Sequence, residues 1–191
     1  YSELNDADIL VMAFGRSRRP GETRLDMFDD SIKMANEVIS HLKQVDFKGI
    51  MISISNPADI ICEHIRRKMN WEPQRCFCTG TSLESLDDLQ LQVKRAGDIE
   101  VDGKGCTEFG IANAACMLIK AIFHDEKLIW PCSTVLSGEY GQKDVAAGVP
   151  CVIGKNGIEE ILELPLTEEE QAKFTASCDI LRGFLERAAS L

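Results

Sequence analysis

The stretch GRSRRPGETRLD, residues 15–26, directly follows the apolar run ADILVMA at residues 7–13. A short run that is almost wholly apolar predicts a strand covered on both faces of a parallel sheet. Such sheets bind ligands just outside the carboxyl ends of their strands. The stretch holds four arginines, two glycines and a proline, so it predicts a cationic loop at that edge. Because a guanidinium fork accepts two oxygens, the loop is either a site for a carboxylate or phosphate or an ordinary solvated loop.

The segments after this loop alternate between two periodicities. Apolar residues recur at spacings of three and four over residues 25–44, which predicts a helix. Residues 50–54 and 75–78 are predicted strands, and residues 59–69 form a predicted helix between them. Strand, helix, strand, helix, strand in this order predicts a parallel sheet with right-handed crossovers, and hence an α/β domain over residues 1–80.

The remainder of the chain, residues 81–191, has the pattern of an α+β domain. Helices are predicted at 86–96 and 110–123, and strands at 133–137, 149–154 and 158–164, with residues 138–148 as a turn region. Asn156 and Gly157 form a strong hairpin signal. Thr167 and Glu170 have the spacing of a capping box, which predicts the start of a last helix over about residues 168–189.

Composition excludes several classes of partner. The formal charge is −10, which argues against nucleic acid because phosphate binding needs a basic face. No apolar run approaches the roughly 20 residues of a membrane helix, and no signal peptide is visible. We therefore expect a cytoplasmic protein. The strand at 7–13 has little sequence before it, so we also expect a segment upstream of Tyr1.

The eight cysteines are predicted to be mostly buried thiols, with disulfides and metal ligation as the alternatives. Cys62, Cys116, Cys132 and Cys151 stand in apolar surroundings, where a free cysteine packs as a small hydrophobe. The only close pair, at residues 76–78, is a single C-x-C, which is weak support for zinc. A thiol or metal module that uses this pair remains an alternative hypothesis for the function.

Short motifs along nearly the whole chain resemble one family, the NAD-dependent L-lactate and malate dehydrogenases. They are RPGETRLD at 19–26, SNP at 55–57, GTSL at 80–83, GEYG at 138–141, GVP at 148–150, GKNGI at 154–158 and LTEEE at 166–170. The resemblance implies an incomplete Rossmann-like parallel sheet followed by an α+β substrate domain. It also implies NAD as cofactor, a short 2-hydroxy or 2-oxo acid as substrate, and a homo-oligomer, in which the small-residue helix at 110–123 would suit a subunit interface.

The resemblance further implies roles for individual residues. Arg24 would polarise the reacting carbonyl and stabilise the charge that grows on its oxygen. Asn56 would contact the substrate oxygen, and the bond between residues 56 and 57 would be a cis peptide. The dinucleotide groove would be lined by Ala13, Phe14, Gly15, Ile54, Asn56 and Ile111. For Ala13 and Ile54, ordinary packing at strand ends is an equally good reading.

The chain also departs from the family pattern. Glu84 stands where an aspartate would orient the catalytic histidine, and that histidine is absent, as are the arginine that clamps the substrate carboxylate and the Gly-x-Gly-x-x-Gly loop. His41, His64 and His124 lie in other contexts and are predicted surface or core residues. We expect that a segment is missing between Ser85 and Leu86. A true deletion there would instead give a catalytically silent paralogue.

The choice between lactate and malate depends on residues of the substrate pocket. Arg18 occupies the specificity position, where an arginine is the malate-type residue because it can pair with a second carboxylate. Thr107 and Ile111 match the lactate-type pocket instead. We favour lactate and keep malate as the alternative. Arg16 and Arg19 are interpreted as solvated charges.

Overall fold

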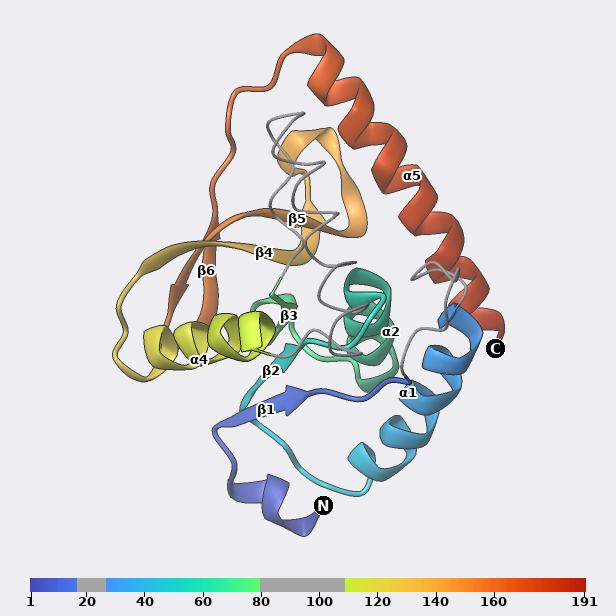
Figure 1. The fold of residues 1–191 in the computed structure, drawn as a ribbon, viewed down its shortest axis with the longest axis vertical. Coiled ribbons are helices and arrows are strands. Elements are labelled where there is room, and N and C mark those ends of the chain that lie inside the picture. The colour runs from blue at the N-terminus through green and yellow to red at the C-terminus, as the bar shows by residue number, and fades with distance from the viewer. Residues whose placement is uncertain (17–26, 80–108) are drawn as a thin grey trace.

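Three short apolar strands form the parallel half of a six-stranded sheet in the computed structural model (Figure 1). They are β1 (Ile9–Met12), β2 (Ile50–Ser53) and β3 (Cys76–Cys78), and β2 pairs with both neighbours in parallel. All four residues of β2 are buried, as its apolar run predicts. The structure describes residues 1–16, 27–79 and 109–191. Within them the predicted parallel sheet is confirmed, with each strand a little shorter than predicted.

Two helices cover one face of this parallel half. They are α1 (Phe28–Leu42) and α2 (Ala58–Met69), and both carry an apolar stripe toward the sheet. α2 ends at Met69, and the next residue, Asn70, has a left-handed backbone and donates its N–H to the carbonyls of Arg66 and Arg67. Two short 3-10 turns, Ser2–Asp6 and Pro73–Arg75, precede β1 and β3. The helices therefore lie where the 3.6-residue periodicity predicts them.

The sheet continues into an antiparallel half. β4 (Leu128–Ser137), β5 (Lys143–Gly154) and β6 (Gly157–Ile161) follow β3 in the order β1-β2-β3-β4-β5-β6. Cys78 of β3 lies opposite Ser133 of β4, and this pairing joins the two halves. The turn between β5 and β6 contains Asn156, which confirms the predicted hairpin. The division of the chain at residues 80 and 81 remains a prediction.

The predicted turn region at 138–148 is wrong for most of its length. A single 3-10 turn, Glu139–Gly141, is followed at once by β5, which pairs Ala146 with Val135 and Ala147 with Thr134. Alanine and glycine have low strand propensity, so the sequence here resembles a loop. The long β4 partner overrides that local preference, because strand formation depends on the cross-strand neighbour more than on the residue itself.

The other helices are α4 (Phe109–Phe123) and α5 (Glu168–Ser190). Thr167 and Glu170 form the predicted capping box at the start of α5, with both reciprocal hydrogen bonds present. The prediction that Cys116 is buried is wrong, because it lies on the exposed side of α4. A mostly apolar helix need not be buried on every side, and α4 packs on the sheet through Leu118, Ala121 and Ile122.

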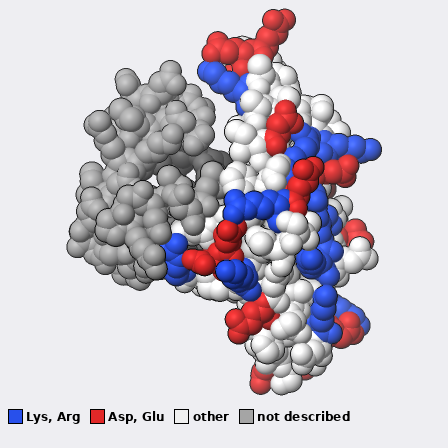
Figure 2. Space-filling view, turned by 90° about the vertical axis from the view of Figure 1, so that its right-hand side faces the viewer, with Lys and Arg blue, Asp and Glu red and all other residues white. Residues whose placement is uncertain are grey.

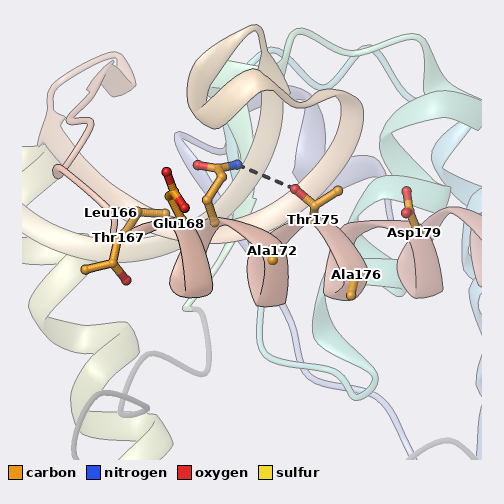
Figure 3. A pocket seen from close by; sticks show the side chains of 8 residues that line it. Leu166, Thr167, Glu168, Ala172, Thr175, Ala176 and Asp179 are labelled. Atoms are coloured by element: carbon orange, nitrogen blue, oxygen red, sulfur yellow. Dashed lines mark hydrogen bonds between the residues drawn. The ribbon is translucent and has the colours of Figure 1, made fainter.

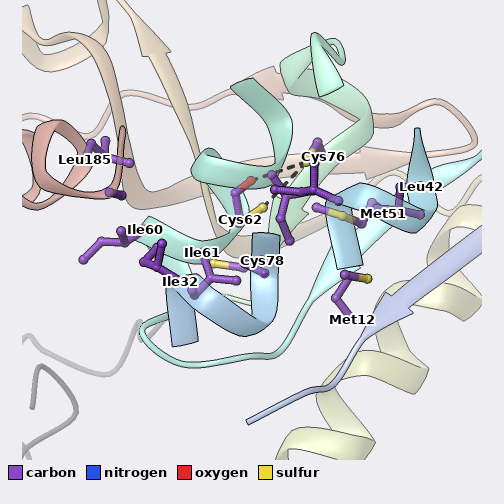
Figure 4. Close-up of a cluster of buried hydrophobic side chains, with 14 of the residues drawn as sticks. Met12, Ile32, Leu42, Met51, Ile60, Ile61, Cys62, Cys76, Cys78 and Leu185 are labelled. Carbon is purple, nitrogen blue, oxygen red and sulfur yellow. Dashed lines mark hydrogen bonds between the residues drawn. The ribbon is translucent and has the colours of Figure 1, made fainter. Parts of the chain in front are cut away.

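Two apolar clusters lie on opposite faces of the sheet. The first joins α1, α2 and the end of α5 to the sheet through Met12, Met51 and Cys76 (Figure 4). The second joins α4 to the antiparallel strands and to Ile52 and Phe77. Neighbouring residues of β2 and β3 point to opposite faces and so enter different clusters. Apolar side chains therefore pack on both faces of the sheet.

Candidate active site

The carboxyl ends of β1 and β2 lie side by side because the two strands are parallel neighbours. The N–H of Ile54 donates to the carbonyl of Met12 at 2.9 Å, which extends the pairing one residue beyond β2. On the other side of β2, the N–H of Thr79 donates to the carbonyl of Ser53 at 3.4 Å. Three chain segments therefore leave the sheet at one edge, the place at which open α/β sheets bind ligands.

The predicted groove residues of the first half meet at this edge. Ala13, Gly15 and Asn56 are exposed, whereas Phe14 and Ile54 are half-buried. No described heavy atom lies within 4 Å of the position that a Cβ would take at Gly15. Among the described residues, this edge therefore exposes the small residues Ala13 and Gly15, where a flat ring system could approach the backbone closely. These residues fit one end of a dinucleotide, although their role stays a prediction.

Two serines that sequence reasoning missed hold this edge together. Ser55 Oγ accepts from the N–H of Phe14 at 3.0 Å and donates to the carbonyl of Met12 at 3.3 Å. Ser31 Oγ of α1 donates to the carbonyl of Asn56 at 3.0 Å. Both serines are only 3% exposed. A signal for Ser31 was present, because this polar residue lies among the apolar stripe positions of its helix.

The Asn56–Pro57 peptide bond is cis, as the resemblance implied. It connects the end of β2 to the first turn of α2, in which Asp59 is the acidic residue. Burial raises the pKa of the Asp59 carboxyl, and the nearby hydroxyl of Ser133 partly opposes that shift. The Ser133 Oγ is itself buried and has no hydrogen-bond partner of good geometry among the described residues. The half-buried Asp59 carboxyl therefore lies near Ser133, between α2 and β4.

Arg16 is not the free solvated charge that the sequence suggested. Its Nε lies 2.9 Å from Oδ2 of Asp30, at the start of α1, and its side chain is 25% exposed. This ion pair joins the segment that follows β1 to the first turn of α1. Arg16 therefore helps to hold the segment after β1 against α1, beside the candidate site.

Several predicted site residues lie outside the described residues. They are Arg18, Arg24, Glu84 and Thr107, together with Arg19 and the predicted helix at 86–96. Ile111 is described: it lies in the first turn of α4 and is half-buried. The structure thus gives positions for the predicted groove residues but leaves the predicted catalytic residues as expectations.

The three histidines occupy structural or surface positions, as predicted. His64 of α2 is buried, and its Nε2 lies 2.8 Å from Oδ1 of Asn36 on α1. Burial lowers the pKa of His64 to about 4, with help from the charges of Lys68 and Arg67. His41 stacks on Tyr1 with ring centroids 4.6 Å apart, and His124 is exposed. None of the three lies at the carboxyl ends of β1 to β3.

Cys76 and Cys78 are both buried in β3 and point to the same face of the sheet. The Sγ of Cys76 lies 3.8 Å from that of Cys62 on α2 (Figure 4). The hydrogen bond with Cys76, together with burial, raises the pKa of Cys62, so the thiol form is favoured. Among residues 1–16, 27–79 and 109–191, no three histidine, cysteine or carboxylate side chains are grouped to hold a metal.

A separate hollow lies along the first half of α5. It has a volume of about 660 Å³ and is lined by residues of the 166–179 segment, including Ala172, Ala176 and Asp179 (Figure 3). Gln171 and Thr175 are used in structural contacts, since Gln171 donates to the carbonyl of Tyr140 and Thr175 accepts from Gln142. Because the hollow is lined by residues of the 166–179 segment, it does not coincide with the site at the carboxyl ends of β1 and β2.

The surface around α5 and α1 carries charges of both signs. Figure 2 shows lysine and arginine side chains interspersed with aspartate and glutamate on this face. Ion pairs account for several of them, such as Arg182 with Asp179 and Arg187 with Asp29. The described residues of this face therefore mix charges of both signs, several of them in ion pairs.

Comparison with known proteins agrees with this geometry. Residues 1–78 match the lactate/malate dehydrogenase, NAD binding domain, and residues 69–191 match the lactate/malate dehydrogenase, alpha/beta C-terminal domain. The chain therefore belongs to the lactate/malate dehydrogenase family, whose N-terminal domain binds NAD. This confirms the family, the fold class and the cofactor that the motifs implied.

Curated relatives narrow the comparison. The L-lactate dehydrogenase of Mycoplasma mobile is 30% identical over 246 residues, covering 98% of this chain and 77% of that protein. The L-lactate dehydrogenase of Fusobacterium nucleatum is 30% identical over 243 residues, with 96% and 76% covered. The alignments are longer than the 191 residues of this chain, so these relatives contain residues with no counterpart in it.

Solved structures of both dehydrogenase types share the fold. The malate dehydrogenase of Archaeoglobus fulgidus in complex with NADH is 25% identical, with a TM-score of 0.86 and coverage of 98% of this chain and 78% of that one. The minor L-lactate dehydrogenase of Enterococcus mundtii is 24% identical, with a TM-score of 0.88 and coverage of 97% and 78%. In the described parts of this chain, no helix has the length and apolar character required to cross a membrane.

Proposed function

We propose that this chain interconverts L-lactate and pyruvate with NAD as the hydride carrier. The observation that carries the proposal is the exposed edge at Ala13, Gly15 and Asn56, in a chain similar over nearly its whole length to L-lactate dehydrogenases. Thr107 and Ile111 support the lactate reading because they match that type of pocket. The acceptor would be a small 2-oxo acid, which needs no large cavity.

Each residue of the proposed site has a distinct task. Bound NAD supplies the ring carbon that accepts the hydride from C2 of the hydroxy acid or returns it to the oxo acid. Arg24 donates to the substrate oxygen and stabilises the negative charge that develops there. Asn56 donates to the same oxygen, and Glu84 orients the histidine that would exchange the proton. That histidine is not among the 191 residues of the printed sequence.

A malate and oxaloacetate dehydrogenase is the alternative. The observation that favours it is Arg18, because a guanidinium at the specificity position can bind the second carboxylate of a dicarboxylic acid in a bidentate manner. A methyl group in the same place would leave that charge poorly paired. Selectivity of this kind commonly differs by several powers of ten when a buried polar group loses its partner.

A catalytically silent paralogue is the second alternative. It is favoured by the missing histidine and by Glu84 in place of an aspartate. Intact mass spectrometry of the protein as it is made in its own cells separates this reading from the first. A mass well above 21.2 kDa would show that the protein contains more residues than the 191 of this sequence. It would remove the main support for a catalytically silent paralogue.

NADH oxidation by the protein isolated from its own cells, followed at 340 nm with pyruvate and with oxaloacetate, tests the enzymatic proposals. Faster turnover of pyruvate supports the lactate reading, and faster turnover of oxaloacetate supports the malate reading. No turnover of either acid would overturn both. A protein that binds NADH without turnover would then fit the silent paralogue.

We also propose a homo-oligomer in the cytoplasm. Met117 and Phe123 are exposed large apolar residues on the outer side of α4, and such side chains commonly lie in subunit contacts. Reduced thiols at Cys62, Cys76 and Cys151 suit a reducing compartment. Light scattering after size-exclusion chromatography checks the assembly, and a monomer at micromolar concentration would contradict it.

A further inference from the structure

The backbone at Asn56 is held by a side chain from a different element. Ser31 lies in the first turns of α1, 25 positions earlier in the chain, and its Oγ donates to the Asn56 carbonyl at 3.0 Å. Ser31 is 3% exposed, so water cannot readily replace this hydrogen bond. Its neighbours on the same helix face, Phe28, Ile32 and Ala35, are all apolar and buried. A polar residue at such a position is costly unless its hydroxyl has a defined partner.

The residue before Asn56 is fixed from the opposite side. Ser55 Oγ accepts the N–H of Phe14 and donates to the carbonyl of Met12, so its one proton and one of its lone pairs are both used. These contacts tie the end of β2 to the chain that leaves β1. The turn at Asn56 is thus held between α1 on one side and β1 on the other.

We propose that Ser31 and Ser55 are positioning residues, which fix the backbone of the Asn56 turn so that its side-chain amide is presented correctly to the substrate oxygen. This inference rests on the proposed function, since it assumes the substrate contact of Asn56. Neither serine touches the substrate itself. Their effect is geometric, because hydrogen bonds to a reacting oxygen stabilise the transition state only when the donor is held in place.

A second serine of α1 offers a matched control. Ser40 also donates its Oγ to a backbone carbonyl, that of Glu37 at 2.6 Å, but it is exposed and its bond stays within the helix. Removing its hydroxyl costs α1 one serine hydrogen bond without touching the Asn56 turn. A comparison of Ser31→Ala with Ser40→Ala therefore separates positioning of Asn56 from a general weakening of the helix.

The experiment measures kcat, KM and thermal stability for Ser31→Ala, Ser31→Thr, Ser55→Ala and Ser40→Ala, in the protein isolated with all of its residues. We expect kcat with the preferred oxo acid to fall about tenfold in Ser31→Ala and in Ser55→Ala, with KM for NADH within twofold of wild type. Ser31→Thr keeps the hydroxyl and should recover most of the loss. Ser40→Ala should match wild type in kcat.

A second readout does not depend on turnover. The side-chain amide of Asn56 gives its own pair of proton–nitrogen resonances, which are assigned by their loss in Asn56→Asp. Ser31→Ala should shift or broaden this pair, and Ser55→Ala should speed hydrogen exchange at the Phe14 amide at least tenfold. Ser40→Ala should change neither signal.

The two readouts keep failure of the inference distinct from failure of the proposed function. If wild type turns over neither acid, the proposed function fails, and the resonances alone judge the positioning. If wild type is active but Ser31→Ala and Ser55→Ala keep kcat within twofold and leave both signals unchanged, the positioning role is overturned. Equal losses of kcat in Ser31→Ala and Ser40→Ala would also overturn it.

Discussion

Arg187, near the end of α5, holds both carboxylate oxygens of Asp29 in the first turn of α1, at 2.5 and 2.7 Å. The two residues are 158 positions apart in the sequence. The guanidinium also lies over the ring of Phe28, 5.0 Å from its centroid. The last helix is therefore fastened to the helix that follows the cationic stretch. Both contacts come from one nitrogen, Nη2, so this is a single-nitrogen ion pair at the surface and not a two-nitrogen fork.

Arg187→Ala should lower the free energy of unfolding by about 1 kcal/mol, since both partners are about half exposed and solvent screens their attraction. Urea unfolding at low and high salt is the measurement, and part of the loss should persist at high salt because the contact with Phe28 is not purely ionic. Lys173→Ala, in an exposed pair with Glu169 on the same helix, should cost less. A larger loss of unfolding free energy in Lys173→Ala than in Arg187→Ala would contradict the proposed role of Arg187.

We expect acid to weaken the contact that His64 makes between α2 and α1. Its Nε2 faces Oδ1 of Asn36, which can only accept, so the neutral ring donates. Burial lowers the pKa to about 4 from an ordinary value near 6.5. Between these values the unfolded chain binds more protons, so this contribution to stability is complete above about pH 6.5 and is lost as the pH falls toward 4.

Unfolding free energies measured at pH 7 and pH 5 check this expectation. From pH 7 to pH 5, the unfolding free energy of wild type should fall by about 1 to 2 kcal/mol more than that of His64→Gln. Glutamine can still donate to Asn36 but does not titrate in this range. Both proteins share the loss that comes from carboxylates, so their difference isolates the histidine. An identical pH dependence in the two proteins would show that His64 does not lose a proton on folding.

The fold of the first half could be predicted because each element carries its own signal. Apolar runs of strand length, separated by helical periodicity, leave few alternatives to a parallel sheet. The predicted end of β2 lies close to the observed end, because residues 55–57 combine polar and turn-forming types. The antiparallel half was less predictable: β5 depends on pairing with β4 over nine register positions, and residues such as Ala146 and Gly148 give no local strand signal.

The candidate site could be predicted only in part from residue types. The motifs place the predicted groove residues of the first half at strand ends, and the structure has them there; their role in cofactor binding stays a prediction. Ser31, Ser55 and the pair of Arg16 with Asp30 were missed, because their roles depend on contacts between segments 14 to 43 positions apart. A buried serine in an apolar helix stripe is the one signal that could have pointed to Ser31.

Arg24→Ala should reduce kcat by at least about a hundredfold with the preferred oxo acid, because its hydrogen bond strengthens as charge develops on the substrate oxygen. NADH binding, followed by the enhancement of its fluorescence, should change by less than about twofold. Arg187→Ala serves as a control for the loss of one positive charge far along the chain. Equal losses in turnover and cofactor binding would remove Arg24 from the proposed catalytic role.

Arg18→Gln should shift the ratio of kcat/KM for pyruvate over oxaloacetate toward pyruvate by about tenfold or more, if Arg18 faces the substrate. Glutamine keeps much of the length and polarity of the side chain but cannot pair with a second carboxylate. Both acids are assayed with the same preparation, so errors in active concentration cancel in the ratio. An unchanged ratio would place Arg18 outside the pocket and leave selectivity to Thr107 and Ile111.

Substitution by alanine should lower the free energy of unfolding at Gly49 and raise it at Gly183. A Cβ at Gly49 would overlap the backbone carbonyls of Ala7 and Asp8, which lead into β1, and backbone cannot swing aside as a side chain can. Gly49→Ala should therefore cost at least about 2 kcal/mol of unfolding free energy. At Gly183, inside α5, no heavy atom of another described segment lies within 4 Å of the new Cβ, so Gly183→Ala should gain about 0.5 to 1 kcal/mol from helix propensity. Urea unfolding of both variants beside wild type measures the two shifts. A tolerated alanine at position 49 would mean that the close approach of the chain before β1 to the entry of β2 is not a feature of the folded protein.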